Sequence, residues 1–303
     1  MQRLVFLLAY PILWLISVLP FRVFYMVSDV VYFIVYHIAR YRRATVDENL
    51  DLVFPEKSSA EKTIIRKKFY KHMVDMFLEM IKSISISNSE LKKRFEFTNL
   101  EEIEKIQEMN KSIIVACGHY ASYEWMNSLQ LYDFDYKAFG IYKKIKNPHF
   151  DKLVKDIRGR YDGTLISTSK ATKTITENQE NGILGVYAMI ADQSPKLSRT
   201  RAWANFMGMT VPVFTGTEKL SRSLDMAVVY LHVEKVKRGY YSATFKTLTT
   251  EAAKEPEFDI TRKYFEELEA QINKAPEYYL WTHKRWKHRN APIPSDVVII
   301  KQD

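Results

Sequence analysis

A histidine and a glutamate follow a short apolar stretch in the first half of this 303-residue chain, and both side chains can move protons. Ser112–Cys117 is predicted to be a buried strand, and Gly118 breaks it directly before His119. Glu124 stands five residues after His119. Because catalytic groups of open α/β sheets gather at the carboxyl ends of strands, this position suits an active site.

The spacing of the pair restricts how the two side chains can meet. Residues five apart on a regular α-helix point about 140° away from each other. We therefore expect His119 in a loop or first turn and Glu124 in the following helix, with Gly118 allowing the bend. The carboxylate would then fix the tautomer of the ring and leave the other nitrogen as a general base. The alternative is a solvated loop histidine beside an ordinary helical glutamate.

Cys117 is the single cysteine of the chain, and it directly precedes the Gly118–His119 step. A nucleophilic cysteine beside a histidine would form a thioester intermediate. Cys117 ends an apolar strand, however, so we expect it to act as a small buried hydrophobe. One cysteine excludes an intramolecular disulfide and a multi-cysteine metal site. We expect neither a metal ion nor an organic cofactor.

The elements that must position this pair alternate between strand and helix after Phe95. Such alternation is typical of an α/β fold with a mixed, largely parallel sheet flanked by helices. The segment from 45 to 95 is predicted to be helical, with a helix start at Ser58 and Ser59. The predicted strands are Ser112–Cys117, Tyr136–Tyr142, Thr164–Ser167, Ile183–Ile190, Ala227–Val233 and Tyr241–Leu248. The predicted helices include Glu101–Glu108, Tyr123–Leu131, Pro148–Gly159, Ala171–Gln179, Gly216–Ser223 and Ile260–Ala275.

The N-terminal region is predicted to be a membrane-anchoring helix. Leu4–Phe21 carries no charge, and as one helix it would span roughly 27 Å, close to the hydrocarbon core of a bilayer. The next apolar stretch, Val23–Ala39, contains Asp29, which is costly at the bilayer centre, so we expect it at the interface or packed on the domain. The arginines of segment 40–43 favour a cytoplasmic domain. A cleaved signal peptide and a buried core helix are the alternatives, and no convincing cleavage site follows the apolar run.

The net charge of +9 indicates acidic partners. Nucleic acid, an anionic membrane, an acidic carrier protein and a phosphorylated substrate all meet this condition. The basic residues are dispersed and accompany no nucleic-acid-binding motif, which disfavours a membrane-tethered nucleic-acid binder. The ending WTHKRWKHR combines tryptophans with cations. It suits acidic headgroups or an acidic carrier at a membrane surface, or else its tryptophans pack on the domain.

The ordered motifs resemble the late lipid A acyltransferases, the lauroyl and myristoyl acyltransferase family. The resemblance covers most of the chain and implies an acyltransferase that shares the H-x4-D/E motif with glycerolipid acyltransferases. It implies that His119 is the general base and that Glu124 orients it. Besides the N-terminal region, the segments that carry it are RYRRATVDENLDLVFPE, GHYASYEW, IYKKIKNPHFDKLVKDIRGRYDG, ADQSP and PEYYLWTHKRWKHR.

Four further residues are candidates for binding substrate or stabilising charge. Arg160 belongs to an RGR sequence after a predicted helix, and an arginine fork suits phosphate or carboxylate oxygens. Asp192 and Gln193 follow the predicted strand Ile183–Ile190. Lys143 stands where the resembling family usually has arginine. A surface arginine and a turn aspartate are the alternatives for Arg160 and Asp192.

The expected reaction moves a fatty acyl chain from a thioester to a hydroxyl of a lipid A precursor. The resemblance implies acyl carrier protein, or acyl coenzyme A, as donor and the cytoplasmic side of the inner membrane as the location. Residues 1–43 would form the anchor and interfacial helix, and 44–303 the acyltransferase domain. A lysophospholipid, aminolipid or glycolipid acceptor stays open. A hydrolase is the other alternative, although the sequence contains no G-x-S-x-G elbow.

Overall fold

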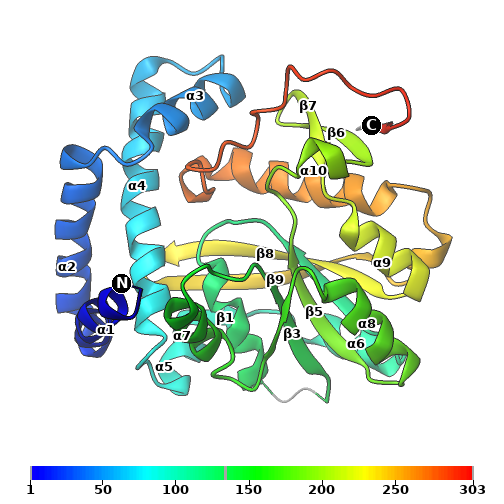
Figure 1. The fold of residues 1–303 in the computed structure, drawn as a ribbon, viewed down its shortest axis with the longest axis horizontal. Helices are drawn as coiled ribbons and strands as arrows, with labels where there is room; N and C mark the ends of the chain where they lie inside the picture. The colour runs from blue at the N-terminus through cyan, green and yellow to red at the C-terminus, as the bar shows by residue number, and fades with distance from the viewer. Residues whose placement is uncertain (1, 133–134, 302–303) are drawn as a thin grey trace.

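The computed structural model describes residues 2–132 and 135–301. Seven strands form the main sheet in the order β1-β9-β8-β2-β5-β3-β4 (Figure 1). Neighbouring strands are parallel except for the pair β8 and β9, which confirms the mixed, largely parallel α/β fold. The strands of this sheet are β1 (Phe95–Phe97), β2 (Ile113–Cys117), β3 (Lys137–Tyr142), β4 (Thr164–Ser167), β5 (Gly185–Ile190), β8 (Ala227–Lys237) and β9 (Tyr240–Thr249).

The predicted helices form with small shifts at their ends. One of them, η2 (Tyr123–Leu131), is a 3₁₀ helix rather than an α-helix. The long helix predicted to start at Ser58 or Ser59 begins with a capping box between Ser58 and Glu61. The α-helices are α1 (Gln2–Val18), α2 (Phe21–Phe33), α3 (Arg43–Val53), α4 (Ser59–Lys82), α5 (Asn88–Arg94), α6 (Glu101–Glu108), α7 (Pro148–Arg158), α8 (Ala171–Glu180), α9 (Gly216–Leu224) and α10 (Asp259–Lys274). Shorter helices are the π-helix η1 (Ile34–Ile38) and the 3₁₀ helices η3 (Leu197–Arg199), η4 (Ala252–Lys254) and η5 (Pro276–Tyr278).

The two faces of the main sheet are covered by different elements. Helices α9 and α10 pack against β2 on one face, where the hydroxyl of Tyr230 donates to Gln271 Oε1 at 2.5 Å. Side chains alternate along a strand, so the neighbouring Leu231 points to the opposite face, which η2 covers. The strand β2 is therefore buried on both sides, as its unbroken apolar sequence predicts.

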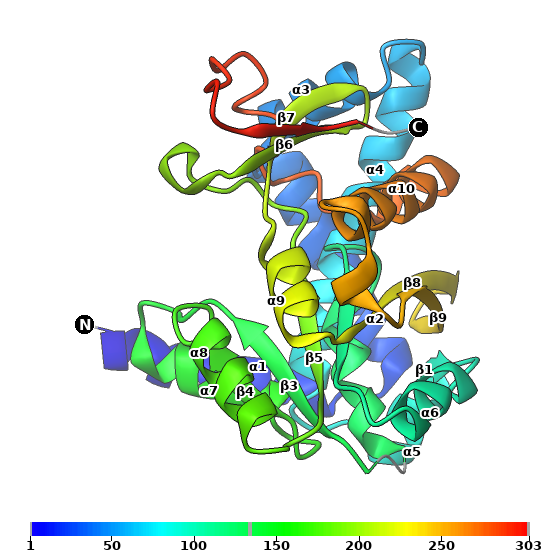
Figure 2. The ribbon, with the colours of Figure 1, turned by 90° about the vertical axis from the view of Figure 1, so that its right-hand side faces the viewer.

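A second sheet, which the sequence analysis did not predict, lies above α10 in Figure 2. Its strands run in the order β10-β6-β7, with β6 (Ala202–Phe206) and β7 (Met209–Val213) forming a hairpin. Met207 and Gly208 join them with φ of 52° and 77°, as a tight hairpin turn requires. The third strand, β10 (Val298–Ile300), pairs with β6 from the far end of the chain. Only β6 and β7 are neighbours in sequence, so periodicity could not reveal the whole sheet.

The N-terminal apolar run is not one helix, which corrects the expectation of a single span over Leu4–Phe21. Helix α1 ends at Val18, and α2 begins after Pro20. Proline has no N–H and disfavours helical geometry in the residue before it, so the run breaks at this point. Among the described residues, the stretch long and apolar enough to cross a membrane is Phe21–Ile38, and 17% of it is buried.

Helix α2 packs along α4, as Figure 1 shows at the left. Ser28 donates to the buried Asp75 carboxylate at 2.6 Å, and Arg238 of β8–β9 binds both Asp75 and Asp29 at 2.7 Å. The expectation that Asp29 lies on a helix packed against the domain therefore holds. The opposite faces of α1, α2 and η1 expose large apolar side chains, among them Leu8, Ile12, Trp14, Met26, Val30, Phe33 and Ile38. This apolar N-terminal pair is a candidate membrane anchor.

Candidate active site

Three neighbouring parallel strands bring the predicted site residues to one edge of the sheet. Strands β2, β5 and β3 lie side by side and end at Cys117, Ile190 and Tyr142. His119, Asp192 and Lys143 follow those ends within two residues. Their convergence is a consequence of parallel pairing, because the carboxyl ends of parallel strands meet at the same edge.

His119 is held by the carboxylate of Asp192. Its Nδ1 lies 2.6 Å from Asp192 Oδ1, and its backbone N–H donates to Asp192 Oδ2 at 3.1 Å. Gln193 Nε2 lies 3.3 Å from His119 Nε2. A carboxylate only accepts and an amide N–H only donates, so both contacts favour a proton on Nδ1 and an unprotonated Nε2 that accepts from Gln193. This is the tautomer that a general base needs.

The electrostatics of the pair follow from burial and mutual attraction. Burial disfavours the imidazolium form, but the charge of Asp192 and its hydrogen bond outweigh this effect and raise the pKa of His119 above its ordinary value. Asp192 is 1% exposed, and burial opposes its ionisation; the His119 ring and backbone N–H nevertheless hold its pKa below the ordinary range. Each group therefore favours the charged form of the other.

Glu124 lies in η2, the helix expected for it, but its hydrogen-bond partner is Arg158 and not His119. Its carboxylate accepts two hydrogen bonds from Arg158, from Nε at 2.9 Å and from Nη2 at 2.6 Å. Its side chain is 5% exposed and makes no hydrogen bond to His119 in the described structure. The physical reason is that Glu124 is in the first turn of η2, below the loop, while β5 places Asp192 directly beside the ring. Glu124 nevertheless lies close enough to raise the pKa of His119 through its charge.

The other substrate-binding candidates differ in their distance from the ring. Gln193 contacts it directly. Arg160 is exposed and donates to the backbone carbonyl of Ser83 at 2.6 Å, beside α1 and α7, so the structure brings Arg158 rather than Arg160 to the site. Lys143 is exposed at the end of β3 and reaches neither His119 nor Asp192 by a hydrogen bond in the described residues.

The loop that carries His119 is fixed by the end of η5 and the residues that follow it. Leu280 N–H donates to the carbonyl of His119 at 3.1 Å, and Ala121 N–H donates to the carbonyl of Tyr278 at 2.9 Å. Ala121 has φ of 50°, a conformation that persists only where surrounding contacts enforce it. Gly118 is needed for close approach, because a Cβ there would meet Leu268 of α10 at 2.5 Å. These contacts therefore fix the conformation of the loop around His119.

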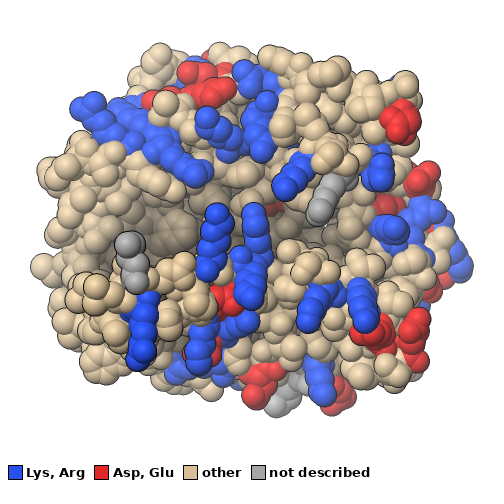
Figure 3. Space-filling view, viewed as in Figure 1, with Lys and Arg blue, Asp and Glu red and all other residues tan. Residues whose placement is uncertain are grey.

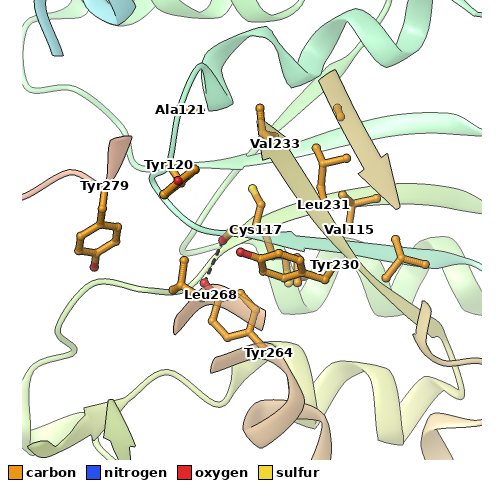
Figure 4. Close-up of a cluster of buried hydrophobic side chains, with 14 of the residues drawn as sticks. Val115, Cys117, Tyr120, Ala121, Tyr230, Leu231, Val233, Tyr264, Leu268 and Tyr279 are labelled. Atoms are coloured by element: carbon orange, nitrogen blue, oxygen red, sulfur yellow. Dashed lines mark hydrogen bonds between the residues drawn. The ribbon is translucent and has the colours of Figure 1, made fainter. Parts of the chain in front are cut away.

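The packing below this loop explains why Cys117 is not a nucleophile. Figure 4 shows Cys117 among Val115, Leu231 and Tyr264, whose hydroxyl donates to its carbonyl at 2.9 Å. The residue is 2% exposed, and burial raises the pKa of its thiol above the ordinary value. A buried, protonated thiol is inert, which agrees with the expectation of a small hydrophobe.

The basic C-terminal segment is mostly a packing element. Trp281 and Trp286 are 0% and 1% exposed, and Trp286 stacks on Phe206 with ring centres 5.6 Å apart. Of the two alternatives for this segment, the structure therefore supports tryptophans packed on the domain. Lys284 and Lys287 are exposed.

His283 of the same segment accepts a hydrogen bond from Ser194 N–H at 3.2 Å and so fixes the loop that holds Asp192. Burial lowers its pKa to about 4, which keeps the ring neutral and able to accept. The role of His283 is not predictable from sequence, since it depends on contacts between distant segments.

A narrow apolar cleft runs between η2 and the sheet. Its wall contains residues from all seven strands of the main sheet, and Arg158 lies at its border. Small side chains leave room in it, among them Ala138, Gly140, Gly163 and Ala188. Met126 of η2 lines the cleft and contacts the sulfur of Cys117 at 3.8 Å, so the cleft begins close to the His119 loop. Its lining suits a hydrocarbon chain, although the open volume of about 30 Å³ is smaller than such a chain.

The surface around this edge is hollowed and positively charged. Figure 3 shows a hollow beside α4 with Lys and Arg side chains above it and to its right. Lys143, Lys144 and Lys146 are exposed directly after β3. A cationic rim beside a deep site attracts anionic substrates or an acidic protein.

The fold therefore places a histidine, paired with a buried carboxylate, at the sheet edge beside an apolar cleft. Over residues 1–288 the chain matches the profile of the bacterial lipid A biosynthesis acyltransferases, and it belongs to that family. It is an acyltransferase.

Curated relatives are similar over most of their length. The chain is 24% identical over 250 residues to lipid A biosynthesis acyltransferase 2 of Shigella flexneri, covering 82% of this chain and 78% of the relative. It is 23% identical over 249 residues to the lipid A biosynthesis myristoyltransferase of Escherichia coli K12, covering 82% and 75%. It is 24% identical over 296 residues to the lipid A biosynthesis lauroyltransferase of the same organism, covering 94% and 92%.

Proposed function

We propose that this protein transfers a fatty acyl chain from acyl carrier protein to a hydroxyl of a lipid A precursor at the cytoplasmic face of the inner membrane. The observation that carries the proposal is the His119–Asp192 pair, with Nε2 free to accept a proton beside an apolar cleft. Family membership supports the reaction and the names of the relatives support the acceptor. In this proposal residues 1–43 anchor the chain and 44–303 form the acyltransferase domain.

The proposed reaction uses this chain's side chains in a fixed order. His119 Nε2 removes the proton of the acceptor hydroxyl as its oxygen attacks the thioester carbonyl. The imidazolium that forms is stabilised by Asp192, and the Gln193 amide, released from Nε2 once that nitrogen is protonated, donates to the developing oxyanion. Collapse breaks the carbon–sulfur bond, and the thiolate leaves with the proton held by His119. No group on the enzyme becomes acylated.

Glu124 and Arg158 act as a structural ion pair beside the reacting atoms in this proposal. Arg158 cannot be deprotonated, and burial, which lowers its pKa, is outweighed by the charge of Glu124. The guanidinium borders the apolar cleft, so it marks the boundary between the polar reacting groups and the acyl chain. Loss of either partner would leave a poorly solvated charge at that boundary.

Mass spectrometry of membrane lipids tests the acceptor in the cell. Deleting the gene should yield lipid A lacking one acyl chain, and the wild-type gene should restore its mass while the His119→Ala variant should not. Unchanged lipid A with an altered phospholipid or aminolipid profile would instead assign the enzyme to another acceptor.

The apolar faces of α1 and α2 predict how the protein is held at the membrane. Because Trp14, Met26 and Phe33 are exposed, the full-length protein should sediment with membranes and resist extraction by high salt. Detergent should release it. Extraction by salt alone would show attachment through charge, and recovery of the intact chain as soluble protein without detergent would contradict the anchor.

The cationic rim predicts a charge-sensitive encounter with the acyl carrier. Lys143→Glu should raise the KM for acyl carrier protein by about 3- to 10-fold at low salt, because the carrier is acidic and Lys143 borders the site. The control is Lys105→Glu on α6, which is exposed but precedes the opposite edge of the sheet. Equal KM values for both variants, or the same effect at high salt, would exclude this surface as the carrier site.

A further inference from the structure

A buried carboxylate outside the reacting groups connects the membrane helix to the catalytic loop. Glu79 of α4 is 0% exposed. It accepts hydrogen bonds from Tyr25 of α2 and Tyr241 of β9, both at 2.8 Å, and from Ser122 at 3.3 Å. These three donors come from segments far apart in sequence, so one carboxylate joins α2, β9 and the loop before η2.

Ser122 is the critical member of this set because of its position. It lies between His119 and Glu124 and is the residue that precedes η2. The next attachment of η2 is on the same helix, since Trp125 Nε1 donates to the backbone carbonyl of Glu79 at 3.1 Å and to Ser83 Oγ at 3.0 Å. The start of η2, which positions Glu124, is therefore attached to the last turn of α4 and to its C-cap residue Ser83.

The loop needs such external support. Ala121 has a positive φ, a backbone conformation that is strained for any residue other than glycine. Tyr278 and Leu280 fix one side of the loop through backbone hydrogen bonds, and Ser122 fixes the other side through Glu79. A fully buried carboxylate is retained only where several donors compensate its loss of water, so this network resists rearrangement as a unit.

Helix α2 is tied to the same part of α4 by a second carboxylate. Asp75, one turn before Glu79, accepts from Ser28 of α2 at 2.6 Å and from Arg238 at 2.7 Å. Lys235 lies 3.7 Å from Asp75 and balances the buried charge. The polar face of α2 thus contacts Asp75 and Glu79, the second of which also binds Ser122 of the loop after His119. The apolar face of α2 is exposed.

We propose that Glu79 is a positioning residue through which α2 and β9 hold the His119–Glu124 loop in its active geometry. Turnover then depends on α2 staying packed on α4, although neither Glu79 nor α2 touches the reacting atoms. The expected effect on turnover rests on the proposed function, whereas the effect on the position of the loop does not.

Matched alanine variants test the link to the loop. Ser122→Ala removes the hydroxyl that reaches Glu79, and Ser128→Ala removes one that is equally buried in η2 but has no hydrogen-bond partner in the described residues. Misplacing the loop should lower kcat about 10- to 100-fold in Ser122→Ala. Ser128→Ala should stay within about twofold of the wild type.

Two tyrosine variants test the link to the membrane helix. Tyr25→Phe removes the α2 donor to Glu79, whereas Tyr32→Phe removes an α2 hydroxyl that makes no hydrogen bond among the described residues. Tyr25→Phe should lower kcat, as Ser122→Ala does. Tyr32→Phe should not.

A second readout separates positioning from simple loss of folded protein and from failure of the proposed function. Diethylpyrocarbonate reacts with neutral imidazole, so the pH dependence of its reaction at His119, followed by peptide mass spectrometry, reports the pKa of His119 without any substrate. Ser122→Ala and Tyr25→Phe should shift this profile, because moving Glu124 and Arg158 changes the field at the ring. The two control variants should keep the wild-type profile.

Unshifted profiles in Ser122→Ala and Tyr25→Phe would overturn the inference, whether activity is normal or falls equally at every pH. Shifted profiles in a wild-type-like fold would support it. If the wild type transfers no acyl chain to any lipid, the proposed function fails, and the diethylpyrocarbonate profiles still decide whether Glu79 positions the loop.

Discussion

Replacing His119 with alanine should reduce acyl transfer by about two to four orders of magnitude, the usual contribution of a positioned proton acceptor. The reason is geometric: Nε2 is the free ring nitrogen, because Nδ1 lies 2.6 Å from the buried Asp192. Steady-state kinetics with an acyl thioester and a lipid acceptor measures the loss. An unchanged melting transition must accompany it, so that the loss is assigned to chemistry.

The partner of His119 should be almost as important. Asp192→Asn removes the charge that supports the imidazolium and permits the wrong tautomer, and the corresponding change in a serine protease costs about four orders of magnitude. The matched control is Asp156→Asn, an exposed carboxylate on α7 that pairs with Lys152. Wild-type turnover in Asp192→Asn would refute the assigned pair.

The pH dependence of the same variants has a definite sign. Asp192 raises the pKa of His119, and a general base works only when it is neutral. In the wild type kcat/KM should therefore rise with pH through a value above about 6.5, the ordinary pKa of histidine. Asp192→Asn should move this acid limb to lower pH while lowering the plateau. A limb that stays in place would mean that another group titrates.

Glu124 should couple to Arg158, not to His119. Glu124→Gln and Arg158→Gln should each destabilise the protein by about 2 to 4 kcal/mol, because each leaves a poorly solvated partner. Each should also lower kcat, since Arg158 borders the apolar cleft and the charge of Glu124 acts on His119. Chemical denaturation and kinetics of the two single variants and the double variant form the measurement.

The double variant decides the role of Glu124. If the pair acts as a unit, Glu124→Gln with Arg158→Gln should cost little more than either change alone. The opposite result would be additive losses for Glu124 and Arg158, with Glu124→Gln adding little to the loss from His119→Ala. That result would restore Glu124 as the group that orients the base. The structure predicts the first result, because both Arg158 bonds end on the Glu124 carboxylate.

The sequence predicts the fold well wherever a local pattern determines an element. Strand β4 and helix α6 have the predicted bounds, and the capping box at Ser58 sets the start of α4. The three-stranded sheet is not predicted as a whole, because its outer strand β10 comes from residues near the C-terminus. The break at Pro20 could have been predicted, since proline and the residue before it both disfavour a continuous helix.

The candidate site shows which inferences need the tertiary structure. His119 and Asp192 both follow predicted strands, so their placement at strand ends is readable in the sequence. Their pairing is not, because it depends on β2 and β5 being neighbours, although the paired residues Ile113 and Val186 are 73 positions apart and β3 and β4 lie between them in the chain. Arg160 is the candidate in the sequence analysis above, whereas Arg158 is the arginine at the site. A helix-face argument would have found it, since Arg158 ends α7 and Arg160 lies beyond Gly159.

The acceptor is the central claim, and one reaction tests it most directly. Purified full-length protein in detergent or vesicles is mixed with acyl carrier protein loaded with a fatty acid and with equal amounts of a lipid A precursor and a lysophospholipid, and the products are weighed by mass spectrometry. We expect the lipid A precursor to gain one acyl chain, the lysophospholipid to stay unchanged, and the His119→Ala protein to form neither product. Acylation of the lysophospholipid instead, or release of free fatty acid as the only product, would contradict the proposed function.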